Sequence, residues 1–211
     1  MAFLTIIPVA ALGALTATSF NETFLVGEEI PDNDPAGLSD TQFIDASDIV
    51  SIETIQIDLE LSGGWLGDIY GYVQHDSGFS VLLNRVGRNE GSLLGSSASA
   101  LDVTFTVDGP DIHVADAPYT GIYGVDGRET DPSLVLDTDS QTAMLSSFVG
   151  LPASGNWTLF LADIGPGEIT TVESWSLSIT GVPEPMTTVS LLGIAAGVLV
   201  LVRSVGRRKK F

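Results

Sequence analysis

Alternation of apolar and polar residues is the feature that most limits what this chain of 211 residues can fold into. From Thr54 to Leu61 every second residue is isoleucine or leucine, and the residues between them are Thr, Gln, Asp and Glu. A period of two puts successive side chains on opposite faces, as in a strand with one buried face. The same spacing returns in four further segments: Phe79, Val81 and Leu83; Val103, Phe105 and Val107; Trp157, Leu159 and Leu161; and Trp175, Leu177 and Ile179.

Turn signals separate these segments, and no stretch between the two ends of the chain has a helical period. We therefore predict one all-β domain over residues 20–182, a β-sandwich or jelly roll of about eight or more antiparallel strands. The chain has no cysteine, so the domain relies on its own core and not on disulfides. The turn signals are Ser62-Gly63-Gly64, Asp76-Ser77-Gly78, Asp108-Gly109-Pro110, Asp126-Gly127, Ala153-Ser154-Gly155 and Gly165-Pro166-Gly167.

Both ends of the chain are apolar. Residues 1–19 predict a secretory signal peptide with Ala17, Thr18 and Ser19 as its cleavage zone, which implies a secretion translocon and a signal peptidase as partners. A buried N-terminal strand is the alternative. Near the C-terminus, the uncharged run 186–202 spans about 25 Å as a helix and predicts a transmembrane segment.

Residues 183–210 combine that apolar run with a proline motif before it and a basic cluster after it. The basic cluster predicts a cytoplasmic flank, so the preceding chain lies outside the membrane. The prolines predict that Val182 to Pro185 are extended and exposed, within reach of a protease. The motif is Pro183, Glu184 and Pro185, and the basic residues are Arg203, Arg207, Arg208, Lys209 and Lys210.

The charge between the two ends is strongly negative. Residues 20–182 hold three cations, Arg85, Arg88 and Arg128, against twenty-six acidic residues, which leaves a net charge of −23. Such a charge repels nucleic acid and anionic lipid, so a nucleic-acid partner is excluded.

The tail resembles the PEP-CTERM sorting signal of Gram-negative bacteria, because its proline motif, apolar span and basic end follow in that order. The resemblance implies recognition and processing by the membrane enzyme exosortase. The protein would then be held transiently in the inner membrane and delivered to the cell envelope, the cell surface or the extracellular matrix. An ordinary membrane anchor with an incidental motif is the alternative.

Two segments of the domain resemble the P/Homo B domain, the P domain of proprotein convertases. One runs from Ile30 through the Gly67-Asp68 pair to Val73, and the other is GNWTLFLADIGPGEITTVESWSLSIT, Gly155 to Thr180. Residues 84–135 do not align with the family pattern. The resemblance implies a β-sandwich with a stabilising, non-catalytic role beside subtilisin-like proteases; this chain contains no protease domain.

Residues for catalysis are few. The only histidines are His75 and His113. His75, Asp76 and Ser77 are consecutive, so they cannot form a triad among themselves, and we predict solvated loop residues. His113 lacks the spacing of a zinc motif. The sequence therefore predicts a protein that is not an enzyme.

Calcium is the one cofactor that the sequence suggests, because carboxylates cluster on loops. Turn-capping aspartates are the alternative. The candidate ligands are Asp32 and Asp34; Asp108, Asp111 and Asp116; and Asp131, Asp137 and Asp139.

Tryptophans offer a glycan contact. Trp157 and Trp175 are in phase with apolar neighbours and predict core residues, whereas Trp65 follows two glycines and is the candidate sugar platform. The leading hypothesis is a non-enzymatic surface or matrix protein with the sandwich as a structural or interaction module. The alternative is a carbohydrate-binding jelly roll that contacts extracellular polysaccharide in a biofilm matrix.

Overall fold

A computed structural model describes residues 17–183. The signal segment up to residue 16, the apolar run 186–202 and the basic cluster lie outside this range, as do Glu184 and Pro185. None of the helices between residues 17 and 183 has the length and apolar character needed to cross a membrane. The elements are β1 (Thr18–Glu29), β2 (Asp34–Ile44), β3 (Ile49–Gly63), η1 (Leu66–Asp68), β4 (Ile69–His75), β5 (Gly78–Asn84), β6 (Ala100–Phe105), η2 (Ile112–Val114), β7 (Tyr119–Tyr123), η3 (Leu145–Phe148), β8 (Gly155–Asp163) and β9 (Thr170–Pro183).

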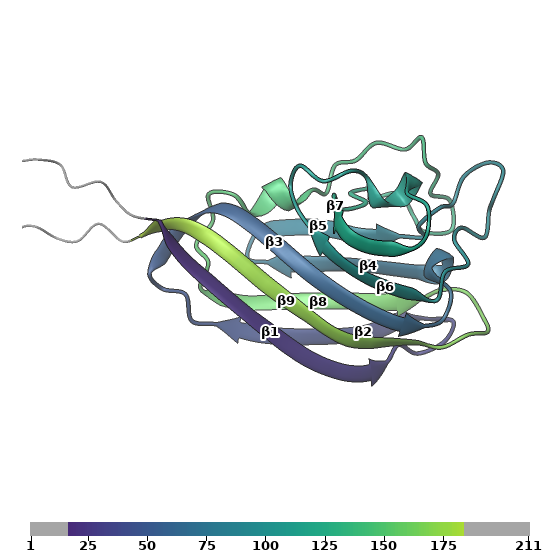
Figure 1. The fold of residues 1–211 in the computed structure, drawn as a ribbon, viewed down its shortest axis with the longest axis horizontal. Helices are drawn as coiled ribbons and strands as arrows, with labels where there is room; N and C mark the ends of the chain where they lie inside the picture. Colours follow the sequence, from purple (N-terminus) through teal and green to yellow (C-terminus); the bar gives the residue numbers. More distant parts are fainter. Residues whose placement is uncertain (1–16, 184–211) are drawn as a thin grey trace, which may run out of the picture.

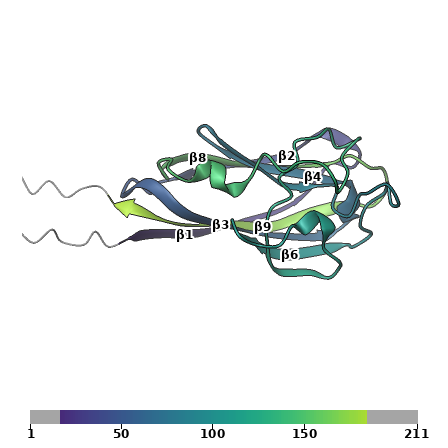
Figure 2. The same cartoon turned by 90° about the horizontal axis from the view of Figure 1, so that it is seen from above.

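The strands form two stacked sheets (Figures 1 and 2). One has five strands in the order β1-β9-β3-β6-β7, and the other has four in the order β2-β8-β4-β5. The predicted all-β fold is confirmed. Neighbouring strands are antiparallel except β6 and β7, which are parallel. Both strands lie within residues 84–135, which do not align with the P/Homo B pattern.

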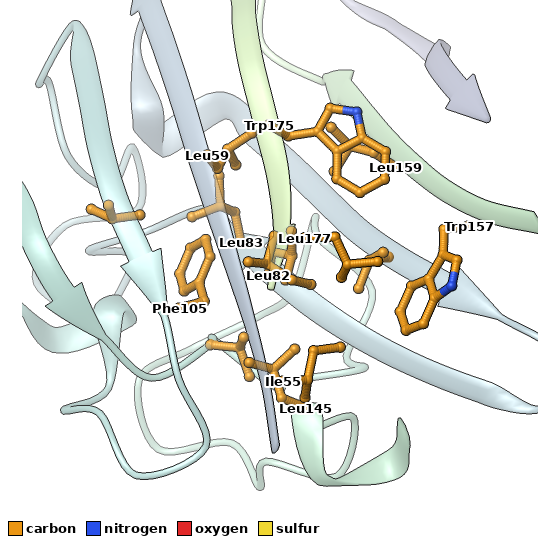
Figure 3. Close-up of a cluster of buried hydrophobic side chains, with 14 of the residues drawn as sticks. Ile55, Leu59, Leu82, Leu83, Phe105, Leu145, Trp157, Leu159, Trp175 and Leu177 are labelled. Carbon is orange, nitrogen blue, oxygen red and sulfur yellow. The ribbon is translucent and has the colours of Figure 1, made fainter. Parts of the chain in front are cut away.

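The core lies between the sheets and is built from the predicted alternation (Figure 3). Ile55 and Leu59 of β3 face Trp157 and Leu159 of β8, and all four are at most 2% exposed. Each such side chain stabilises the fold by about 1.5 to 3 kcal/mol. Trp157 and Trp175 are core residues as predicted, and their indole N–H groups donate to the Ala153 carbonyl (3.0 Å) and the Asp40 carboxylate (2.7 Å).

Strand β5 departs from the predicted alternation. Its register with β4 pairs Leu83 with Gly71 and Val81 with Tyr72, so Leu82 is an extra residue in a bulge. As a consequence Leu82 and Leu83 both join the core, while Val81 faces outward with Phe79. The prediction that Phe79, Val81 and Leu83 share one face is therefore wrong.

The outer edge of β5 is covered by the segment 124–144. The Gly127 N–H donates to the Val81 carbonyl (2.9 Å), and the Val81 N–H donates to the Ala143 carbonyl (3.0 Å). This covering explains why Val81 is buried although it faces away from the core. On the other sheet β6 ends at Phe105, so Val107 lies beyond the strand and is 39% exposed, contrary to the prediction.

Both ends of the domain lie at the same end of the sandwich (Figure 1). Thr18 of β1 pairs with Gly181 of β9, and Pro183 pairs with Ile49 of β3. Val182 and Pro183 are extended as predicted, but they belong to a sheet and are half-buried instead of fully exposed. Thr18 and Ser19 of the predicted cleavage zone already belong to β1.

Candidate functional site

The aspartates of the first calcium candidate cap backbone groups. An Asp32 carboxylate oxygen accepts from the Gly167 N–H (3.0 Å), and Asp34 accepts from the Ala36 N–H (2.9 Å). Both bonds are of the kind that aspartate makes in turns.

The aspartates of the second and third calcium candidates are either exposed or bonded to other groups of the protein. Asp108 and Asp116 are exposed, whereas Asp111 accepts from the His113 N–H (2.9 Å) and binds Arg128. In the third set, Asp131 caps Ser133, Asp139 accepts from the Leu136 N–H (3.0 Å), and Asp137 contributes its backbone carbonyl to Arg128 (2.8 Å).

Between residues 17 and 183, no three His, Asp or Glu side chains are gathered closely enough to hold a metal ion. Calcium binding by this chain stays a prediction.

A buried polar network that the sequence did not predict joins the segment 124–144 to β5 and to η2. Arg128 is 3% exposed and donates to the carboxylates of Asp111 (2.8 Å) and Asp126 (3.2 Å). Asp126 also accepts from His113, whose Nδ1 lies 2.6 Å from its Oδ2. The backbone N–H of Asn84 donates to the same carboxylate (3.1 Å) and ties the network to β5.

His113 is fully buried, and acceptors lie on both sides of its ring. Nε2 is 2.8 Å from the Arg88 carbonyl, opposite the contact with Asp126. Burial lowers the pKa of His113, but the hydrogen bond and charge of Asp126 and the Arg88 carbonyl outweigh it, so the pKa is raised. The His113–Asp126 pair has no solvent access, since both side chains are 0% exposed, and its geometry is that of a structural hydrogen bond.

All three cations of the domain are engaged internally. Arg88 donates to the Pro132 carbonyl (2.8 Å), and Arg85 donates to the Gly67 carbonyl (2.7 Å) and the Asp68 carboxylate (3.2 Å). With Arg128 in the buried network, these contacts tie the long loops to the sheets and leave the surface to the acidic residues.

His75 ends β4 and is buried, so the prediction of a solvated loop residue is wrong for it. Its ring stacks on Trp157 with centroids 4.1 Å apart and planes 4° apart. Its two nitrogens lie 2.9 Å from the carbonyls of Asn156 and Pro152. Asp76 and Ser77 are exposed turn residues, as predicted.

The two segments that carried the P/Homo B resemblance meet at an acidic corner, defined here as Asp32, Asp68 and Asp163. The Ile164 N–H donates to the Asp68 carbonyl (3.0 Å), and a Cβ on Gly165 would lie 2.2 Å from the Asp68 carboxyl carbon. A larger residue at position 165 would displace the Asp68 carboxylate from the corner.

Asp163 is the most perturbed group of the acidic corner. It is 1% exposed, and the Gly165 N–H donates to it (3.1 Å). Burial, with the charges of Asp68 and Asp32 added, raises the pKa of Asp163 to about 6. Folding therefore disfavours its ionised form near neutral pH.

The outer faces of the two sheets differ in chemistry. The five-stranded sheet carries hydroxyls and carboxylates that bind one another, such as Thr54 with Thr180 (2.5 Å) and Thr104 with Asp58 (2.5 Å). The four-stranded sheet carries an aromatic band, defined here as Tyr70, Tyr72, Phe79 and Phe160. Tyr72 is its centre, with ring centroids 4.8 Å from Phe160, 5.1 Å from Phe79 and 6.1 Å from Tyr70.

Trp65, the predicted sugar platform, precedes η1 and is half-buried. Its indole N–H donates to the Leu94 carbonyl (3.2 Å), which holds the ring against the loop at residues 93–95. The aromatic band was missed, although its signal is present: Tyr70 and Tyr72 alternate with the inward-facing Ile69, Gly71 and Val73, out of phase with the core.

No family model matches the chain, and no curated protein matches it. Among solved structures, it is similar to the serine protease of Aeromonas sobria, with 16% sequence identity and a TM-score of 0.44, and to the complex of that protease with its chaperone, with the same identity and a TM-score of 0.46. Both matches cover 79% of this chain and only 27% of the matched chain.

Proposed function

We propose that this chain is a non-enzymatic exported protein of the bacterial cell surface or extracellular matrix, sorted by an exosortase through its C-terminal segment. The observation that carries the proposal is the order of the last residues: the Pro183-Glu184-Pro185 motif, the uncharged run 186–202 and the basic cluster that begins at Arg203. That order is the pattern of the PEP-CTERM signal. The predicted partners are the translocon, signal peptidase, exosortase and the inner membrane.

The position of the motif relative to the fold is consistent with this proposal. Strand β9 ends at Pro183, so Glu184 and Pro185 follow directly on the last paired residue of the sheet. A membrane-held tail then keeps one end of the sandwich close to the bilayer. The net charge of −23 favours a domain that stands away from anionic lipid, and cleavage after Pro183 frees it whole.

The sandwich itself is, on this proposal, a jelly roll of the P/Homo B type that acts as a structural or interaction module. In support, the order β1-β9-β3-β6 in one sheet and β2-β8-β4-β5 in the other is that of two interleaved Greek keys. The parallel strand β7 is an addition at the edge.

The test is the C-terminus of the protein isolated from the cell surface. Mass spectrometry is expected to find a chain that ends near residues 183–185. Pro185→Ala is expected to leave the chain uncleaved in the membrane fraction, while Pro166→Ala, in an exposed turn, is processed normally. Surface protein with an intact Phe211 refutes the proposal.

A second candidate function, binding of extracellular carbohydrate, is favoured by the aromatic band of the four-stranded sheet. The sequence placed this role on Trp65, whose ring is half-buried and whose N–H is already bonded. The four outward rings on adjacent strands offer a larger platform.

A further inference from the structure

The aromatic band is a continuous surface on three adjacent strands. Phe160 lies on β8, Tyr70 and Tyr72 on β4, and Phe79 on β5, with β4 hydrogen-bonded to both neighbours. All four side chains are half-buried. They pack against one another, so each ring is held in place while part of it faces solvent.

Local backbone geometry fixes the position of the band. Gly37 in β2 has φ +56°, and a Cβ there would lie 2.9 Å from the Phe160 ring and 2.3 Å from the Leu161 carbonyl oxygen. The glycine therefore lets β2 approach β8 closely, with Phe160 lying over it. Rings fixed on strands lose little freedom when a ligand binds, which favours affinity.

The polar groups on the strands beside the band are uncharged, and the nearby charge comes from Glu129 and Asp126 of the segment 124–144, at the Tyr70 end of the band. The outward positions beside it carry Thr41 on β2, Thr158 on β8 and Gln74 on β4, as the strand pairing places them on the same face. The hydroxyls of Thr41 and Thr158 lie 2.9 Å apart. Neither tyrosine hydroxyl of the band has a hydrogen-bond partner among residues 17–183. The face thus combines ring surfaces with free donors and acceptors.

The absence of charge on this face is informative because the domain is so acidic. From Ser39 to Phe43 on β2, Asn156 to Ala162 on β8, Tyr70 to Gln74 on β4 and Phe79 to Val81 on β5, no outward position holds a carboxylate. The opposite sheet carries Asp58, Glu60 and Asp102 on its outer face. A band whose strands carry no carboxylate, with acidic residues only at its Tyr70 end, suits a neutral ligand better than an anionic one.

We infer that the aromatic band binds a neutral polysaccharide, with sugar C–H faces on Tyr72 and Phe160 and sugar hydroxyls on the surrounding Thr, Gln and Tyr groups. Apolar rings with a few polar groups around them are the usual lining of sites for such amphipathic ligands. A second copy of the chain is a poorer occupant, because residues 20–182 of each copy carry a net charge of −23. This inference specifies the interaction module of the proposed function.

The test is affinity gel electrophoresis of the purified full-length chain in a detergent without a sugar headgroup. The gels contain hydroxyethylcellulose, laminarin or galactomannan as neutral probes, and alginate as an anionic one. We expect retardation by at least one neutral probe and none by alginate. Tyr72→Ala is expected to weaken that binding about tenfold, as the loss of one aromatic contact implies.

Two controls keep the result interpretable. Leu25→Ala removes an 87% exposed side chain from the other sheet and is expected to bind like the wild type. Tyr72→Phe keeps the ring and is expected to retain most of the binding, and the urea midpoint of each variant shows that it is folded. Retardation by none of the neutral probes, retardation by alginate alone, or equal binding by folded Tyr72→Ala overturns the inference.

Two other occupants give different results. If binding changes tryptophan emission and the change disappears in Trp65→Phe, the ligand lies at Trp65, and the inference is wrong. If the wild type sediments as a dimer that Tyr72→Ala dissociates, a second copy covers the band, and the inference is wrong. Failure here leaves the sorting proposal intact, because that proposal is decided by the C-terminus and not by binding.

Discussion

Replacing Asp163 with asparagine is expected to stabilise the protein near neutral pH. Asparagine keeps the carbonyl oxygen that accepts from the Gly165 N–H, but it carries no charge to bury beside Asp68 and Asp32. The pKa of Asp163 is raised from 3.8 to about 6, a shift of about 2 units. At about 1.36 kcal/mol per unit, the ionised carboxylate costs the folded state about 3 kcal/mol.

The sign of the pH dependence follows from the raised pKa. The folded protein binds the Asp163 proton more tightly than the unfolded chain, so the wild type loses this contribution as the pH rises from about 4 to about 6. Above about pH 6 the full cost is present. The benefit of Asp163→Asn is therefore close to zero at pH 4 and reaches about 3 kcal/mol at pH 8.

The assay is urea unfolding at both pH values, followed by circular dichroism. With a slope of about 2 kcal/mol per molar urea, the midpoint at pH 8 should rise by about 1.5 M. Asp116→Asn is the matched control, because it removes one charge from an exposed loop and changes the net charge equally. An Asp163→Asn midpoint at pH 8 no higher than that of the control would refute the reasoning.

The remaining predictions concern the buried network and calcium. Arg128→Met leaves the buried Asp126 carboxylate without its arginine contact and is expected to cost about 3 to 5 kcal/mol in urea unfolding, whereas Arg85→Met, which changes the net charge equally at a partly exposed pair, costs about 1 to 2 kcal/mol. Equal losses would contradict a special role for the network. Calcium is expected to raise the thermal midpoint relative to chelator, since a cation relieves the repulsion of a domain whose three arginines are all engaged internally; an unchanged midpoint removes the calcium hypothesis.

Strands were predictable from the sequence where one face alone meets the core. In β3 the residues Ile55 to Leu61 alternate because one face contacts the other sheet and one contacts water. The edge strands β1 and β2 were not predicted, because their inner faces are only partly covered and need few large apolar residues. In β5 the bulge at Leu82 shifts the register, and Val81 is buried on the outer face, so the period of two no longer indicates which residues face the core.

The candidate sites were less predictable, for a different reason. Aspartates that cap turns and aspartates that bind metal have the same composition, and only the position of the donor, such as the Gly167 N–H for Asp32, tells them apart. The buried pair of His113 and Asp126 joins positions thirteen residues apart with no motif between them. Tyr72 and Phe160 were recognisable in principle, because both are aromatic residues out of phase with the apolar positions of their strands.

The central position of β9 determines how the domain responds to mechanical load. Strand β9 is paired along its length with β1 on one side and β3 on the other, and it ends at Pro183. A pull on Pro183 along the strand acts across hydrogen bonds that run perpendicular to it, so the bonds of both ladders resist in parallel instead of opening one at a time. A sandwich that is attached through Pro183 can therefore carry tension without losing the pairing of β9 with β1 and β3.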